Sequence, residues 1–226
     1  MIAPVKTLRK SDLEWLGTNR CRHGMTYLSH YQCFVDEKPE TAPFSERVGY
    51  FDIETTGFYA DYDFMLSYCI LDDNKKLIKN IVKPREIRQY DFDKRLLCDL
   101  CSDLNKFDRV VVYYGADYRF DIPFSRTRAI KHGLDFPLYK DVFVTDVYSI
   151  VRNKLRLSRR RLGNVCGLFE IPVKAHPGDP NIWMRAAAGS KQDLEYILVH
   201  NIEDVESLRE LYHRIIGYSA NTKRSI

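Results

Sequence analysis

The chain has 226 residues, of which 45% are hydrophobic and 29% are charged, and its formal net charge is +4. This composition excludes a disordered or collagen-like chain, and the length predicts one main domain with room for a small appendage. The sequence contains no apolar run of ~20 residues and no charged-then-apolar leader, so we expect no membrane span, no secretory signal and a cytoplasmic location. The mild positive charge allows a polyanionic partner but does not require one.

Residues 1–47 have a composition of their own, and we expect them to form an N-terminal appendage that ends in the turn-prone segment 36–43. Within it, a C-x-H-x6-H-x2-C pattern is formed by Cys21, His23, His30 and Cys33. Sulfur and imidazole ligands suit a tetrahedral Zn²⁺ site, and an appendage this short would need a bound metal of this kind to stabilise its fold. The spacing is not a common zinc-finger spacing, so unrelated polar loop residues are the alternative.

The main domain is expected over residues 48–218, and its first segment runs from Val48 to Gly57. This apolar stretch, bounded by a turn signal, predicts a buried strand on which Asp52 and Glu54 share one face. Unpaired buried carboxylates are costly, and hard divalent cations prefer carboxylate oxygens. The stretch therefore predicts a Mg²⁺ or Mn²⁺ site, with a salt-bridged edge strand as the alternative.

The next segments alternate between strand and helix patterns. Residues 65–71 and 76–82 predict two strands of a hairpin, and apolar residues at helical spacing predict a helix over 91–107. Residues 109–114 predict a central strand. Asp121 follows it beside Pro123, which marks a helix start, and α/β sheets bind ligands at such junctions.

The last third of the chain contains a basic run and two helices. Residues 152–161 hold six basic residues in ten, which form either a solvated helix face or a phosphate-contact surface. A short segment over 142–148 contains Asp146. Asp179 predicts the cap of a helix that ends near residue 188, and Ser190 predicts the start of the last long helix. On that helix His200 and Asp204, four residues apart, share a face, and the tail 219–226 is expected to be frayed.

Three motifs resemble those of the DEDD (DnaQ-like) exonuclease superfamily, which has a ribonuclease-H-like fold. They are Phe51-Asp-Ile-Glu-Thr-Thr-Gly57, Phe120-Asp121 with Pro123-Phe124, and His200-Asn-Ile-Glu-Asp-Val205. The third motif is most similar to that of a group of predicted ribonuclease-H-like (YprB-like) exonucleases. The resemblance covers about residues 48–215. It implies an α/β fold with a mixed five-stranded sheet in the order 3-2-1-4-5, in which strand 2 is antiparallel and helices flank the sheet.

Four carboxylates from three predicted elements can enclose two divalent ions, the arrangement used for phosphodiester hydrolysis. They are Asp52, Glu54, Asp121 and Asp204. The resemblance implies a metal-dependent 3′–5′ exonuclease that acts on single-stranded or frayed nucleic acid with two Mg²⁺ or Mn²⁺ ions. By analogy, Asp52, Glu54 and Asp204 hold the ion that activates water, and Asp52 and Asp121 hold the ion at the leaving oxygen. The alternatives are a structure-specific endonuclease and a non-catalytic nucleic-acid-binding module.

The general base is expected to be His200, because an imidazole titrates near neutral pH. Its spacing of four residues from Asp204 is that of the tyrosine subclass of the family, so Tyr196 is kept as a second candidate. Asp117 stands where many relatives carry Asn. It could add a metal-shell carboxylate or only a hydrogen bond.

Nucleic-acid contacts are expected beside the carboxylates and on basic side chains. Thr55 and Thr56 are expected to touch the terminal nucleotide. The phosphate backbone is expected to contact Arg126, Arg128 and the cluster Arg156–Arg161, which includes Arg159 and Arg160. Both DNA and RNA remain open as substrates, and replication or repair proteins are candidate partners that the sequence does not identify further.

Overall fold

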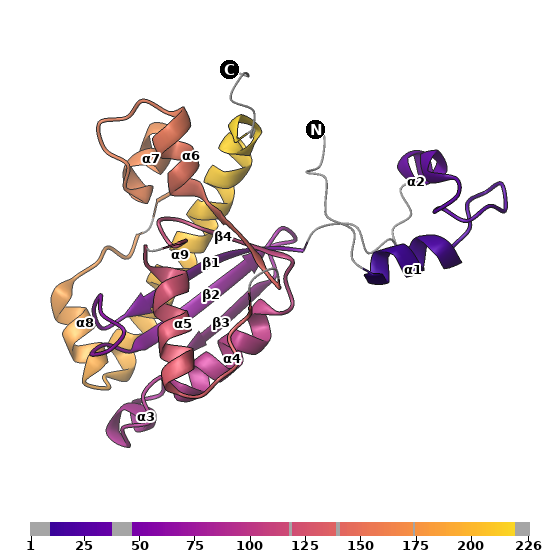
Figure 1. The fold of residues 1–226 in the computed structure, drawn as a ribbon. Coiled ribbons are helices and arrows are strands. Elements are labelled where there is room, and N and C mark those ends of the chain that lie inside the picture. The colour runs from indigo at the N-terminus through magenta and orange to yellow at the C-terminus, as the bar shows by residue number, and fades with distance from the viewer. Residues whose placement is uncertain (1–9, 38–46, 118, 139–140, 174, 220–226) are drawn as a thin grey trace. The chain divides into compact units, whose positions relative to one another are not determined.

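The computed structural model describes residues 10–37, 47–117, 119–138, 141–173 and 175–219. The chain divides into two compact units, 1–46 and 47–226, which are described separately. The first unit contains helices α1 (Lys10–Thr18) and α2 (Tyr31–Glu37), joined by a long loop (Figure 1). Most of the predicted turn 36–43 and nearly all of the predicted frayed tail lie outside the described residues.

The second unit is built on one five-stranded mixed sheet. Its strands are β1 (Val48–Thr55), β2 (Met65–Asp72), β3 (Leu77–Ile81), β4 (Arg109–Val112) and β5 (Phe143–Asp146). Their order is β3-β2-β1-β4-β5. Strand β2 is antiparallel to both β1 and β3, whereas β4 runs parallel to β1 and β5 parallel to β4. This confirms the expected strand order, the antiparallel second strand and the hairpin.

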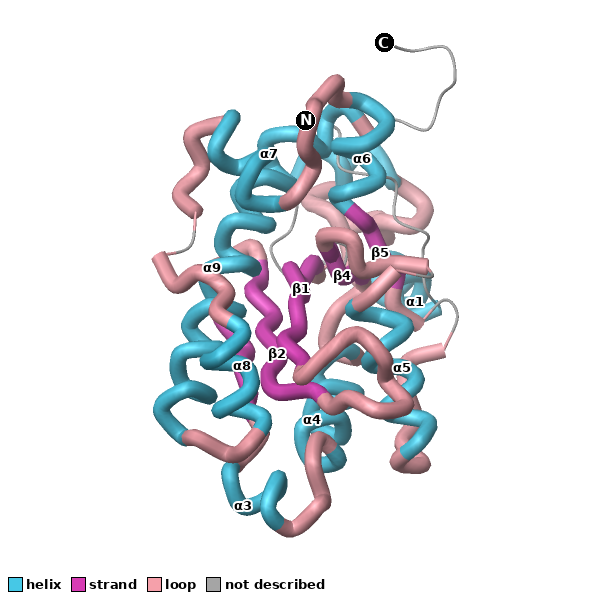
Figure 2. Tube along the Cα trace, turned by 90° about the vertical axis from the view of Figure 1, so that its left-hand side faces the viewer, coloured by secondary structure: helices cyan, strands magenta, loops and turns pink. Residues whose placement is uncertain are grey.

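Helices cover both faces of this sheet. They are α3 (Pro84–Arg88), α4 (Lys94–Leu104), α5 (Asp121–Lys131), α6 (Val147–Lys154), α7 (Leu162–Leu168), α8 (Pro180–Ala187) and α9 (Lys191–Ile215), followed by the short 3₁₀ helix η1 (Ile216–Tyr218). Figure 2 shows the sheet between α4 and α5 on one side and α8 and α9 on the other. Among the described helices, none is long and apolar enough to cross a membrane.

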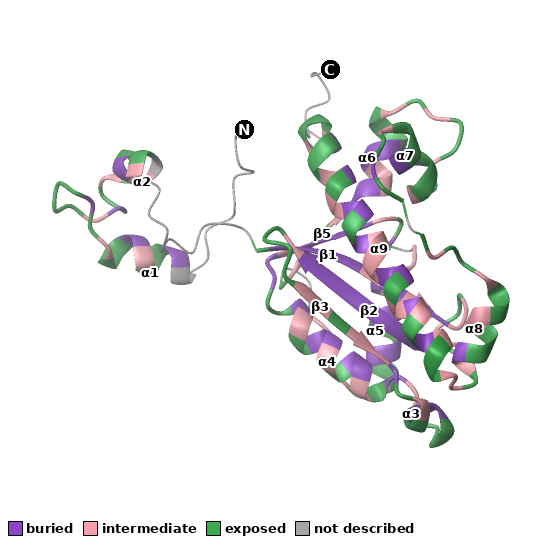
Figure 3. Ribbon diagram, turned by 180° about the vertical axis from the view of Figure 1, so that it is seen from behind, coloured by how far each residue is buried: buried purple, intermediate pink, exposed green. Residues whose placement is uncertain are grey.

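The alternation of side chains along β1 divides the core between the two faces. Phe51 and Ile53 belong to the cluster that includes the apolar residues of α4 and α5. Val48 and Tyr50 belong to the cluster that includes those of α6, α7 and the second half of α9. Figure 3 shows that strands β1 and β2 are buried along most of their length. Asp52 and Glu54 follow the period of Val48 and Tyr50, and therefore face α9.

Both predicted helix caps are confirmed. The Asp179 carboxylate accepts a hydrogen bond from the amide of Asn181 at 2.9 Å, and Pro180 takes the first position of α8. The Ser190 hydroxyl accepts from the amide of Asp193 at 3.4 Å at the start of α9. These side chains satisfy amides that a helix N-terminus leaves without an intrahelical partner.

Three element boundaries differ from the expectation. The predicted helix 91–107 is shorter, because Tyr90 and Phe92 adopt positive φ before α4 begins. Strand β4 ends at Val112, since Tyr114 turns the chain at φ +63°. The basic run 152–161 does not form one helix face: α6 ends at Lys154, and the rest of the run is a loop before α7.

Candidate active site

Strand β1 places two carboxylates next to each other on the α9 side of the sheet. Asp52 pairs with Cys69 and Glu54 with Ser67 across the β1–β2 ladder, and both carboxylate residues are half-buried. The register shifts between Glu54 and Thr55, where the strand ends. A bulge at the end of a strand often redirects side chains beside an active site. The two carboxylates thus lie on a rigid element close to the end of β1.

Helix α9 fixes the first of these carboxylates through Asn201. This residue is fully buried, and its amide donates to Oδ2 of Asp52 at 2.5 Å. The Ser67 hydroxyl of β2 donates to the amide oxygen of Asn201 at 3.3 Å. Asn201 therefore links β1, β2 and α9 through one side chain. Sequence reasoning assigned it no role, and its position inside the third motif was the only signal.

His200 presents one ring nitrogen to two carboxylates. Its Nε2 lies 3.3 Å from Oε1 of Glu54 and 3.5 Å from Oδ2 of Asp204. Its Nδ1 donates to the backbone carbonyl of His176, and the Trp183 ring packs against it edge-on at a centroid distance of 5.1 Å. The bond to a carbonyl places the proton of the neutral ring on Nδ1, which leaves the Nε2 lone pair facing the carboxylates.

The loop that holds His200 is itself anchored to α9. Glu203 accepts hydrogen bonds from the His176 ring at 2.8 Å and from the His176 amide at 3.1 Å. Burial acts to raise the pKa of Glu203, but these hydrogen bonds from His176 lower it overall. The Tyr196 hydroxyl donates to the carbonyl of Pro177 at 3.0 Å. This bond directs Tyr196 to the loop backbone, whereas His200 directly contacts two carboxylates.

A potential metal-binding group forms around His200. The ligand atoms of Glu54, His200 and Asp204 all lie within 4.8 Å of one another. The two carboxylates supply the oxygen donors that Mg²⁺ and Mn²⁺ prefer, so they fit the metals expected from the sequence, whereas an imidazole suits softer metals. Asp52 and Asp121 are not members of this group and approach it from neighbouring positions on β1 and α5.

Asp121 opens helix α5 and lies against β1. It is 3% exposed, and its carboxylate is hydrogen-bonded by the backbone of Ile53, the residue between Asp52 and Glu54. Burial, followed by the negative charges of Asp146 and Asp204, raises the pKa of Asp121 to about 8. A Cβ atom at Gly115 would lie 1.9 Å from Oδ2 of Asp121. Only glycine at position 115 leaves room for the carboxylate in this place.

Asp146 holds the segment that precedes Asp121, a role that sequence reasoning did not assign. Its carboxylate accepts from the amides of Tyr114 at 3.0 Å, Ala116 at 3.2 Å and Tyr148 at 2.9 Å. The Arg119 guanidinium donates to it at 2.5 Å. Asp117 is exposed at φ +56°. Asp117 belongs to neither group of potential metal ligands in the described part of the chain.

The residues after Glu54 shape a loop between β1 and β2. The Thr55 hydroxyl donates to the carbonyl of Gly57 at 2.6 Å, and the Thr56 hydroxyl donates to Oδ1 of Asp63 at 3.1 Å. Three aromatic side chains project from this loop into solvent, with exposures of 82%, 72% and 87% for Phe58, Tyr59 and Tyr62. We call the segment that carries Phe58, Tyr59 and Tyr62 the aromatic loop. The sequence contains many aromatic residues and does not show which of them are exposed, so it does not identify these three as candidates for stacking.

The expected phosphate contact at Arg128 is wrong. Its side chain is 3% exposed, and its Nη2 lies 2.6 Å from Oδ1 of Asp93, which is fully buried. Its Nε donates to Oδ2 of the same carboxylate at 2.9 Å. A guanidinium enclosed in a bidentate ion pair is not available to a nucleic-acid backbone. Arg128 instead neutralises a carboxylate inside the fold.

The other basic residues named for phosphate contact are exposed or half-buried. Arg126 is exposed, with its guanidinium 5.8 Å from the centre of the Phe136 ring. Arg159 and Arg160 lie on the loop between α6 and α7, which the Tyr113 hydroxyl holds by donating to the Arg160 carbonyl at 2.5 Å. A hollow of about 430 Å³ on this loop is lined by Arg159, Arg160, Arg161 and Asn164.

Comparisons with known proteins place this site in a family. A family model described as the RNase H superfamily matches residues 49–216, more than half of the chain. The chain belongs to the RNase H superfamily. The matched range includes the candidate site of this RNase H superfamily member in full, from Asp52 to Asp204. A search of curated protein sequences gave no match to it.

A solved structure shares its fold. The family B DNA polymerase from the hyperthermophilic archaeon Pyrobaculum calidifontis matches with a TM-score of 0.57 and 16% identity. The match covers 79% of this chain but only 25% of the polymerase chain. At this identity the likeness shows the fold alone. Together with the superfamily match, it identifies the second unit as a nuclease-type fold.

Proposed function

We propose that this RNase H superfamily protein is a metal-dependent 3′–5′ exonuclease that hydrolyses single-stranded or frayed nucleic acid. The observation that supports this most strongly is the group formed by Glu54, His200 and Asp204, whose ligand atoms lie within 4.8 Å of one another. Asp52 neighbours this group on the same strand, and Asp121 reaches the same strand from α5. Four of these five side chains are carboxylates, which supply the oxygen donors that two divalent ions would take.

Asp52, Glu54, Asp121 and Asp204 would hold two Mg²⁺ or Mn²⁺ ions. When bound, such ions stabilise the attacking and leaving oxygens of a phosphodiester. The His200 ring keeps a proton on Nδ1 through its bond to the His176 carbonyl, so Nε2 can accept the proton of the attacking water. Glu203 keeps the His176 carbonyl in place, and Asn201 keeps Asp52 directed toward α9.

The aromatic loop is the reason for proposing a single-stranded substrate. Phe58, Tyr59 and Tyr62 follow directly after the Glu54 strand, where Thr55 and Thr56 shape the turn that would face the terminal nucleotide. Stacking of a base on an aromatic ring contributes roughly 1–3 kcal/mol and tolerates any sequence. Arg126, Arg159 and Arg160 would hold the phosphate backbone.

The test is a time course on 5′-labelled single-stranded DNA and RNA of one sequence, with Mg²⁺, Mn²⁺ or EDTA. Wild-type protein is expected to shorten the strand from its 3′ end in Mg²⁺ or Mn²⁺ and to be inactive in EDTA. Asp204→Asn should abolish shortening while the circular dichroism spectrum stays unchanged. Glu206→Gln is the matched control, because Glu206 is exposed on the same helix and should not affect the rate.

A circular single strand distinguishes the nuclease classes. An exonuclease leaves it intact, whereas cleavage of the circle would replace the proposal with an endonuclease on the same fold. Failure of the wild-type protein to cleave either linear strand in any metal would refute nuclease activity and favour a nucleic-acid-binding module.

A further inference from the structure

A loop of the first unit brings two cysteines and two histidines together. The Cys21 amide donates to the Met25 carbonyl at 2.8 Å, and the Gly24 amide donates to the Cys21 carbonyl at 2.8 Å, which closes a tight turn. Gly24 occupies φ +75°, where a residue with a side chain would be strained. Cys21 and His23 stand on this turn. His30 directly precedes helix α2, and Cys33 lies in its first turn.

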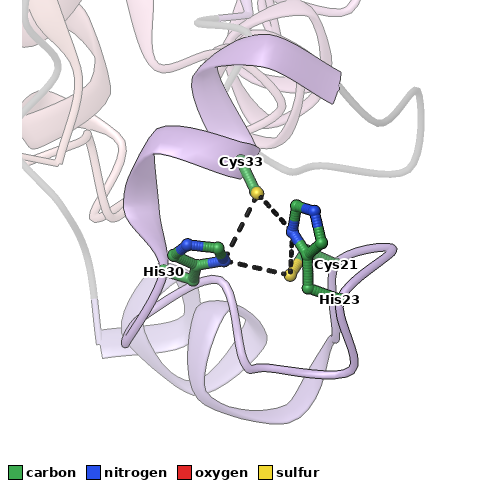
Figure 4. Close-up of side chains that lie close together, drawn as sticks. All are labelled: Cys21, His23, His30 and Cys33. Carbon is green, nitrogen blue, oxygen red and sulfur yellow. Dashed lines mark hydrogen bonds between the residues drawn. The ribbon is translucent and has the colours of Figure 1, made fainter.

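The four ligand atoms have the separations of a coordination tetrahedron. The Nδ1 atom of His23 lies 3.9 Å from the sulfur of Cys21 and 3.1 Å from that of Cys33. The Nδ1 atom of His30 lies 3.5 Å and 3.3 Å from the same two sulfurs. Figure 4 shows the four side chains directed at a common centre. Zn–S bonds of about 2.3 Å and Zn–N bonds of about 2.0–2.1 Å give sulfur-to-nitrogen edges of about 3.6 Å in a tetrahedron.

We propose that Cys21, His23, His30 and Cys33 bind one structural Zn²⁺ ion on which the first unit depends for its fold. All four ligand atoms lie within 4.8 Å of one another. Two thiolates balance the charge of the ion, and a closed set of four protein ligands is typical of structural rather than catalytic zinc. Both imidazoles direct the same nitrogen at both sulfurs, as shared coordination requires.

The small core of this unit explains why the ion is needed. Its buried apolar residues in the described range are Leu16, Cys21, Tyr27 and Cys33, and two of these four are the ligands themselves. The unit spans only residues 1–46, close to the ~40 residues below which a chain usually needs a disulfide, a metal or a partner. Zinc binding would therefore supply folding free energy that the apolar contacts do not.

A tryptophan next to the site reports on this fold. The Trp15 ring stacks on Tyr27 with centroids 5.6 Å apart, and Phe34 packs edge-on against both rings. The Tyr27 hydroxyl donates to Glu37 at 2.6 Å, and the Arg22 amide donates to the same carboxylate at 3.2 Å. The chain has two tryptophans, so Trp183→Phe makes Trp15 the sole fluorophore.

The experiment measures metal content and coordination on the full chain. Elemental analysis after gel filtration is expected to find about one zinc per chain in wild type and none in Cys33→Ser. His30→Cys should retain zinc, because a Cys₃His set also binds it. Cys98→Ser is the matched control, since Cys98 is exposed on α4 and should leave zinc unchanged. In the Trp183→Phe background, a chelator should change Trp15 fluorescence, and Zn²⁺ but not Mg²⁺ should restore it.

Cobalt substitution keeps the proposal testable if Cys33→Ser does not fold. Co²⁺ bound to wild type should give thiolate-to-metal charge-transfer bands, which the other potential metal group cannot produce because Glu54, His200 and Asp204 contain no sulfur. Absence of these bands together with absence of zinc in wild type would overturn the proposal. So would a Cys21–Cys33 disulfide found by peptide mapping of the unreduced protein, because both sulfurs would then be unavailable to the metal.

Discussion

Two arginines of helix α5, two residues apart, have opposite environments. Arg126 is exposed, whereas Arg128 points into the fold and pairs with Asp93. The Asp93 carboxylate also accepts from the amide of Met65 at 2.9 Å and contacts the His132 ring at 2.9 Å. It therefore joins the start of β2, the start of α4 and the end of α5. Because the Asp93 carboxylate is fully buried, it needs a cation to balance its charge.

Arg128→Met is expected to lower the free energy of unfolding by about 3–5 kcal/mol, because it leaves the Asp93 charge buried without its ion-pair partner. Urea denaturation measures this loss. Arg126→Met on the same helix is the control and should change stability by no more than about 0.5 kcal/mol. Asp93→Leu combined with Arg128→Met should recover part of the loss. Equal stability of the two single variants would show that the ion pair contributes nothing.

The segment between β4 and α5 delivers Asp121 to the site. Asp146 holds its backbone amides, and the absence of a side chain at Gly115 leaves the space that the Asp121 carboxylate occupies. The position of the Asp121 carboxylate therefore depends on Gly115, a residue that has no reactive side chain. A glycine required for close approach is a different requirement from a glycine at positive φ, and Gly115 is of the first kind.

Gly115→Ala is expected to reduce hydrolysis about as strongly as Asp121→Asn, because the new Cβ would displace the Asp121 carboxylate. It should also cost about 1–3 kcal/mol of stability through overpacking, since Cβ of Val112 would lie 2.9 Å away. Gly163→Ala in α7 is the control, because no atom lies within 4 Å of its added Cβ. Rates from the strand-shortening assay and urea midpoints check both variants. Wild-type activity in Gly115→Ala would mean that Asp121 need not occupy this position.

Local patterns predicted most of the elements. The apolar runs that became β1 and β2, and the capping residues Asp179 and Ser190, act through neighbours in the chain, so sequence alone contains their signal. The strand order came from the family resemblance rather than from periodicity. Positive φ at Tyr90 and Tyr114 shortened two elements, and no composition signal marks such a turn in advance.

The site was predictable only where one element carried the pattern. Asp52 and Glu54 on a strand, and His200 and Asp204 on a helix, follow from spacing. The contact between His200 and Glu54 joins residues distant in the chain, and the roles of Asn201, Asp146 and the His176 loop depend on tertiary packing in the same way. The ion pair of Arg128 is another tertiary contact, which is why its charge was mistaken for a phosphate contact.

At the scale of the whole molecule, the two units contain separate chemistry. The sheet, the candidate metal-binding carboxylates and the loop that carries Arg159 and Arg160 all lie in unit 47–226, and the superfamily match over residues 49–216 falls entirely within it. Both apolar clusters of the second unit are composed of its own residues. The first unit contributes its own small core and the Cys–His group.

A chain that begins at Arg47 is therefore expected to fold and to hydrolyse a short single-stranded oligonucleotide at a rate within about threefold of the full chain, because no described residue of the candidate active site is removed. The rate at saturating substrate, with Mg²⁺ or Mn²⁺, measures this, and Asp204→Asn in the truncated chain controls for a contaminating nuclease. Arg47 must be kept, because its amide and guanidinium bind Asp108 at 3.0 Å and 3.1 Å beside β4. A truncated chain that is folded by circular dichroism but inactive would assign the first unit a direct part in hydrolysis.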